Sequence, residues 1–301
     1  MRVRTVLRFH FLILALPVCI LAQNAKRPLA WKDADNWRSI QSQTLSRDGH
    51  WLAYGLFPQE GDGEVIVRDL RTGKELRENA GTLPPPPEPD PEELTPREGG
   101  PQTMRIRVAF TADGRFLLSS VYPRQAETDQ AKKEKKKPEE MPKNGLVVFD
   151  LNAGKATRVA DVRSFQVPER GPALAAWLKE SKAEAPAKPA PAPRGRARPE
   201  FGSELVLQDL AQSQTKTFPD VIEFTLTKDG ATLVYAVASR KSETNGVFAL
   251  PAKGEAQPAA LLAGKGKYSK LTWDLKQTRL AFLSDRDDAD SKPPKARLYL
   301  W

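Results

Sequence analysis

TLSRDGHWLAYGLFPQEGDGEVIVRDLRTGKEL, residues Thr44 to Leu76, is the stretch that decides the fold, because the chain repeats it with altered side chains. Its Asp48-Gly49 pair lies between apolar runs and predicts a hairpin, since both residues tolerate positive φ. A second strand is expected over Trp51–Leu56 and a third over Glu64–Leu70. A turn at residues 71–74 then leads into a more polar, more exposed fourth strand. Four antiparallel strands in about 35 residues are typical of one propeller blade.

Later copies of this unit predict an all-β propeller of four-stranded antiparallel blades over residues 39–301. Asp113-Gly114 and Asp229-Gly230 repeat the hairpin signal in the second and fourth copies, whereas Arg170-Gly171 replaces it in the third and 274–277 in the fifth. The expected blades are 39–79, 104–160, 162–218, 220–262 and 267–301. The last stops in its third strand, so about four and a half blades are present. A truncated longer chain and a five-bladed ring completed by the N-terminal segment both remain open, because an unclosed propeller leaves an apolar edge.

The N-terminus is typical of an export signal. Arg2, Arg4 and Arg8 precede an apolar run from Phe9 to Ala22 that is short for a membrane span. Residues 1–22 are therefore predicted to be a signal peptide, and the protein is expected in the periplasm or outside the cell. Cleavage after Ala25 and lipidation at Cys19 are the less favoured alternatives.

Residues 23–38 form a lead-in segment, in which Trp31 and Trp37 are expected to anchor against the core of the first blade. Three insertions, 80–103, 123–143 and 181–199, interrupt the blades. The first is a proline-rich linker, the second a charged solvated loop and the third an Ala/Pro/Lys-rich tether. All three follow a second or a fourth strand, so they are expected to crowd one face of the propeller. A basic patch that binds a partner is the alternative interpretation of 123–143.

Composition excludes several function classes. The 301 residues carry a formal net charge of +9, and loss of residues 1–22 removes three arginines and no acid, which leaves +6. This modest excess lies largely in loops that also contain glutamates, so no nucleic-acid partner is expected. The single cysteine, Cys19, lies in the signal. The mature chain therefore has no disulfide, thiol nucleophile or cysteine-based metal site.

No catalytic, cofactor-binding or metal-binding residue is predicted. Of the two histidines, His10 lies in the signal and His50 follows a turn, so His50 is expected to be an exposed turn residue. The recurring aspartates of the hairpins are expected to bond nearby backbone amides. Four aspartates lie close together near residue 288, but they lack the spacing and the glycine of a calcium loop. They are Asp285, Asp287, Asp288 and Asp290.

The stretch WKDADNWRSIQSQTLSRDGHWLAYGLFPQEGDGEVIVRDLRTGKE, with the repeated strand-Asp-Gly-strand and Asp-Leu-x-x-Gly-Lys units and LAFLSDRDD at 280–288, resembles the N-terminal propeller of exported bacterial prolyl oligopeptidase family serine peptidases. TolB-type propellers share the Asp-Gly repeat. The resemblance spans most of residues 26–301. It implies a propeller that admits peptides to an α/β-hydrolase domain with a Ser-Asp-His triad. That domain is missing here, since no G-x-S-x-G elbow occurs.

The expected function is that of the propeller portion of such a peptidase, gating substrate access and docking a hydrolase domain. Its partners would be peptide substrates reached through that domain. The alternative is a free-standing TolB-like propeller that binds a protein in the cell envelope. A degraded gene whose product folds poorly is the third possibility.

Overall fold

The structure is a computed structural model that describes residues 28, 30–34, 37–85, 105–181, 201–291 and 293–301. The predicted signal peptide and most of insertions 80–103 and 181–199 lie outside these residues. In the described part, no helix has the length and apolarity that a membrane span requires. The fold is all-β, a series of antiparallel sheets.

The first two blades are separate four-stranded sheets with strands in chain order. Blade 1 comprises β1 (Arg38–Leu45), β2 (Trp51–Pro58), β3 (Gly63–Asp69) and β4 (Glu75–Gly81). Blade 2 comprises β5 (Val108–Phe110), β6 (Phe116–Val121), β7 (Gly145–Asp150) and β8 (Lys155–Val159). The hairpin and strand pattern predicted from the Asp-Gly repeat is confirmed in both sheets.

Blades 3 and 4 share one strand, β12. They form a seven-stranded sheet of β9 (Val162–Gln166), β10 (Leu174–Lys179), β11 (Ser203–Asp209), β12 (Gln214–Leu226), β13 (Thr232–Val237), β14 (Gly246–Pro251) and β15 (Ala259–Ala263). The first half of β12 pairs mainly with β11 and the second half with β13. Asp220, at φ 57°, lies between the halves and lets an extended chain change partner without a loop.

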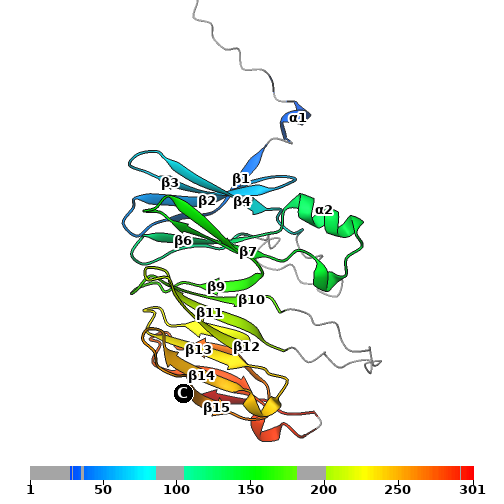
Figure 1. The fold of residues 1–301 in the computed structure, drawn as a ribbon, viewed down its shortest axis with the longest axis vertical. Coiled ribbons are helices and arrows are strands. Elements are labelled where there is room, and N and C mark those ends of the chain that lie inside the picture. Colours follow the sequence, from blue (N-terminus) through cyan, green and yellow to red (C-terminus); the bar gives the residue numbers. More distant parts are fainter. Residues whose placement is uncertain (1–27, 29, 35–36, 86–104, 182–200, 292) are drawn as a thin grey trace, which may run out of the picture.

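The fifth blade has three strands, β16 (Tyr268–Trp273), β17 (Leu280–Ser284) and β18 (Arg297–Leu300). Figure 1 shows the blades stacked in chain order along the long axis of the molecule. A separate apolar core fills each of the four spaces between successive blades. Strands that are apolar on both faces, such as β13, are thus explained by a blade on either side.

The two end blades each leave one apolar face uncovered. On blade 1, Ile40 is 62% exposed and Leu45 55% exposed; on blade 5, Leu298 is 65% exposed and Leu300 71% exposed. On β18, Tyr299 lies between the two exposed leucines and packs on the core shared with blade 4. In the described residues the propeller is therefore open.

The lead-in segment does not anchor the core, so that prediction is wrong. Trp31, in the short helix α1 (Trp31–Ala34), is 95% exposed, and Trp37 is 57% exposed. The inner face of blade 1 is already filled by blade 2, where Ile106 packs in the same core as Phe57. Neither tryptophan of the lead-in belongs to that core.

Insertion 123–143 is a helix and not only a solvated loop. It contains α2 (Gln125–Lys133) and a 3₁₀ turn, η1 (Pro138–Glu140). The N–H of Gln125 donates to the carboxylate of Asp62 at 2.8 Å, from the β2–β3 loop of blade 1. Lys132 and Lys133 lie in the last turn, where cations complement the helix dipole. These contacts at the two ends stabilise the helix, which the run of charged residues did not predict.

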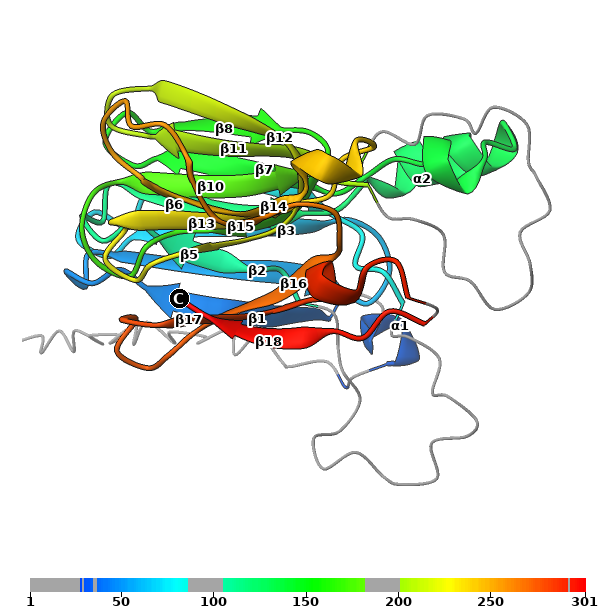
Figure 2. The same cartoon turned by 90° about the horizontal axis from the view of Figure 1, so that it is seen from below.

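The connections between second and third strands do project from one face. Figure 2 shows α2 on the same side as the 3₁₀ turns η2 (Ser242–Thr244) and η3 (Arg286–Asp288), opposite the hairpin turns. Insertion 123–143 thus projects from the face that carries the connections between second and third strands. The other two insertions lie mainly outside the described residues.

Candidate functional site on the first strands of the blades

The hairpin aspartates are turn formers, as predicted. Ser46 Oγ donates to Asp48 Oδ1 at 2.6 Å, and the N–H of His50 donates to the same oxygen at 3.1 Å. Thr111 with Asp113 and Thr227 with Asp229 repeat the side-chain bond at 2.5 and 2.6 Å. The Ser46 bond holds the pKa of Asp48 below its usual value, and the Thr227 bond does the same for the pKa of Asp229.

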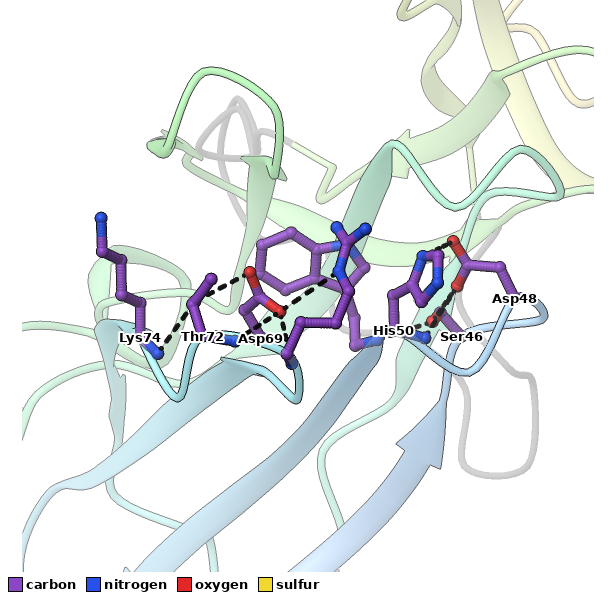
Figure 3. Close-up of polar contacts among 8 residues, drawn as sticks. Ser46, Asp48, His50, Asp69, Thr72 and Lys74 are labelled. Atoms are coloured by element: carbon purple, nitrogen blue, oxygen red, sulfur yellow. Dashed lines mark hydrogen bonds and ion pairs between the residues drawn. The ribbon is translucent and has the colours of Figure 1, made fainter.

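The Ser46, Asp48 and His50 side chains meet, but not as a catalytic triad. Asp48 lies between the other two, since His50 Nδ1 is 2.9 Å from Asp48 Oδ2 (Figure 3). A triad needs the imidazole between the hydroxyl and the carboxylate, so that it can take the serine proton. Here the Ser46 hydroxyl donates a hydrogen bond to Asp48 and accepts one from the N–H of Trp51 at 2.9 Å. The hydroxyl is a structural element of the turn.

A second set of aspartates closes the turns between third and fourth strands. Asp69 accepts the N–H of Arg71 at 2.8 Å and the hydroxyl of Thr72 at 2.9 Å, as Figure 3 shows. The backbone bond from Arg71 lowers the pKa of Asp69. Asp150 and Asp209 accept backbone N–H groups in the same way. The Asp-Leu-x-x-Gly-Lys unit is therefore explained by the fold.

The acidic residues near the C-terminus are each engaged by protein groups. Asp285 accepts the N–H of Lys267 at 2.6 Å, Asp287 accepts the Tyr299 hydroxyl at 2.7 Å and Asp288 accepts the N–H of Lys295 at 2.9 Å, while Asp290 pairs with Lys265. Across the described residues, no group of three or more potential metal ligands converges.

The first strands of the blades form the surface that best fits a functional role. They meet across blades, because β1 contacts β5 and β12 contacts β16. Side-chain hydrogen bonds also connect three of the four pairs of successive blades at this surface. Ser42 Oγ donates to the Ile106 carbonyl at 2.5 Å, and both carboxylate oxygens of Glu223 accept N–H groups, from Lys270 at 2.7 Å and Leu271 at 2.9 Å.

Between blades 3 and 4 the link is Gln166. Its side-chain oxygen accepts the N–H of Leu226 at 2.9 Å and its amide donates to the Phe224 carbonyl at 3.2 Å. Sequence reasoning missed these linking residues. A signal for two of them was present, because Ser42 and Glu223 both lie four residues before the Ser or Thr that opens the hairpin.

The same surface is rich in arginine. Arg38, Arg105, Arg107, Arg163 and Lys270 are exposed on or beside the first strands. The Arg107 guanidinium lies over the Phe165 ring of blade 3, 5.1 Å from its centroid. Arg107 is exposed as a whole residue, but partial burial of its guanidinium lowers its pKa. No acidic side chain contributes to that shift, so the cation is held by an aromatic ring in place of a carboxylate.

One open groove of about 600 Å³ lies elsewhere, at the β11–β12 and β14–β15 hairpins. Its lining includes Gln214, Thr215 and Lys216, and Lys216 Nζ donates to the Gly254 carbonyl. These are the residues of a solvated hairpin surface, and the groove suggests no chemistry of its own.

No family model matches this chain, and no curated protein matches it. Among solved structures it is similar to a prolyl endopeptidase, with 16% identity and a TM-score of 0.39 over 87% of this chain and 34% of that one. It is similar to the β-propeller domain of the Trilobed protease from Pyrococcus furiosus, with 10% identity and a TM-score of 0.44 over 89% of this chain and 69% of that one. It is also similar to Pyrococcus horikoshii acylaminoacyl peptidase, with 10% identity and a TM-score of 0.41 over 90% of this chain and 39% of that one. The chain thus spans about a third of the length of the prolyl endopeptidase.

Proposed function

We propose that this chain is the propeller portion of an exported serine peptidase of the prolyl oligopeptidase type, which gates peptide access and docks a hydrolase domain. The observation that carries the proposal is the pair of uncovered apolar faces. Ile40 and Leu45 at one end, and Leu298 and Leu300 at the other, are each more than half exposed. Soluble proteins rarely leave such faces bare unless another structure covers them. The sequence resemblance set out above supports the same proposal.

The proposed role is steric and needs no chemistry from the chain itself. Ser46 and His50 are separated by Asp48, and the repeated aspartates are occupied by turn hydrogen bonds. Peptides would approach along the first strands, and cleavage would occur in the hydrolase domain.

The coding DNA downstream of codon 301 tests the proposal. We expect the reading frame to continue through further blades into a domain with a G-x-S-x-G elbow. A stop codon directly after Trp301, together with a stable monomer, would contradict it and favour a free-standing TolB-like module that binds a protein in the cell envelope. Export is tested separately by N-terminal sequencing of the natural protein, which should begin after Ala22.

The recombinant 301-residue chain should not hydrolyse proline-containing fluorogenic peptides. The Ser46→Ala variant serves as the control, because Ser46 is a hydroxyl residue in the same turn as His50. Turnover that survives purification and disappears in this variant would overturn the assignment of Ser46 to the turn.

A further inference from the structure

The first strands carry an uneven distribution of charge. The segments 38–45, 105–110, 162–166, 221–226 and 268–273 contain five basic residues and one acidic residue. The acidic residue is Glu223, and two backbone N–H groups of blade 5 already occupy its carboxylate. The exposed cations of this surface therefore face little opposing charge from the strands themselves.

Arg105 and Arg107 form the best-defined part of the surface. Alternate residues of an extended segment share one face, and Ile106 between them is buried in the core of blades 1 and 2. The backbone here is fixed from two sides, because Ser42 Oγ donates to the Ile106 carbonyl and the N–H of Arg107 donates to Ser120 Oγ at 2.8 Å. The two guanidinium groups are thus presented by a rigid backbone.

Neither arginine forms an ion pair with a described carboxylate. The Arg107 guanidinium lies over the Phe165 ring, 5.1 Å from its centroid, and a cation–π contact of this kind uses none of the N–H donors. Planar guanidinium groups bind carboxylates in bidentate geometry. Strands β1, β5 and β9 are also edge strands of their sheets, so one side of each has free backbone groups.

We propose that Arg105 and Arg107 bind the acidic side chains of extended peptides that lie along the first strands. The inference deepens the proposed function, because it gives the gate a preference for anionic peptides. It can fail independently, since binding is measured on the isolated chain without a hydrolase.

The test is fluorescence anisotropy with the intact chain and a rhodamine-labelled peptide of alternating glycine and glutamate. The matched probe replaces each glutamate with glutamine. We expect the acidic probe to bind at least tenfold more tightly than the neutral probe, and the double variant Arg105→Gln/Arg107→Gln to abolish most of that difference. Equal binding of the two probes to the unmodified chain would overturn the proposal.

The control variant Lys74→Gln/Lys155→Gln removes the same charge from exposed residues of the hairpin face. It should change affinity less than twofold, and an equal loss in the control would show that only net charge matters. The variant Arg105→Glu/Arg107→Glu should prefer a glycine–lysine probe, a gain that misfolding cannot produce. Tighter binding of inorganic polyphosphate than of the acidic peptide, lost in the same arginine variant, would overturn the assignment to peptides.

Discussion

Glu223 offers the sharpest test of how the blades are joined. Its two carboxylate oxygens accept the N–H groups of Lys270 at 2.7 Å and Leu271 at 2.9 Å. Lys270 is at φ 62°, a conformation that a residue with a side chain adopts only when its surroundings hold it there. The carboxylate is the group that fixes this irregular point of β16 to blade 4.

The variant Glu223→Gln keeps one acceptor but turns an amide N–H₂ toward one of the two donors. A hydrogen bond to a charged group is worth roughly 1.5–3 kcal/mol. Glu223 is half-buried, so water compensates part of the loss, and we expect about 2 kcal/mol of local destabilisation. Since about 1.4 kcal/mol is a factor of ten, amides of β16 to β18 should exchange with deuterium roughly 30-fold faster.

Hydrogen–deuterium exchange with mass spectrometry measures this by segment. Blades 1 and 2 should exchange as in the unmodified chain, and so should the control Glu243→Gln, which removes the same charge from the exposed turn η2. Unchanged exchange in β16, or an equal acceleration in every blade, would refute the role assigned to Glu223.

Three further predictions concern α2, a blade junction and pH. Asp62→Asn should destabilise α2, because the carboxylate that accepts the first N–H of the helix is lost. Trypsin should then cleave within the helix faster, and mass spectrometry of the fragments measures the rate. Gly81→Ala should lower the free energy of unfolding in urea by roughly 3 kcal/mol or more, because φ is 70° and the new Cβ would lie 2.1 Å from the Tyr122 carbonyl oxygen. Gly49→Ala, at φ 72° with nothing within 4 Å, should lose only about 1 kcal/mol, and equal losses would contradict the argument. The pKa values of Asp48 and Asp229 are lowered in the folded state, so the unfolded chain binds more protons. Stability should therefore be fully present above about pH 5 and fall as pH drops below about 4; thermal melts that show no loss from pH 5 to pH 3 would contradict this.

The elements with local signals were predictable from the sequence. An Asp-Gly pair between apolar runs specifies a hairpin within six residues, and the hydrogen bonds of Asp48 and Asp229 are closed inside the same turn. Repetition then strengthened each signal. The exposed, polar fourth strand follows from the same pattern in blade 2, where β8 is mostly exposed, but not in blade 1, where β4 is mostly half-buried or buried.

The features that were missed depend on contacts between distant segments. The helix α2 begins at an N–H that Asp62 accepts, 63 residues earlier in the chain. The shared strand β12 depends on the pairing of its first half with β11 and of its second half with β13. Trp37 is exposed because other residues fill the core that it was expected to enter. The arginines of the first strands lie on the second blade and its neighbours, and only the fold brings Arg107 onto Phe165.

The most direct test of the central claim uses the natural protein. An antibody raised against α2 should recover from the source cells a polypeptide larger than this 33.4 kDa chain, and a fluorophosphonate probe for serine hydrolases should label that same polypeptide. Recovery of a species of about 33 kDa or less that the probe does not label would contradict the claim that this propeller gates a serine peptidase.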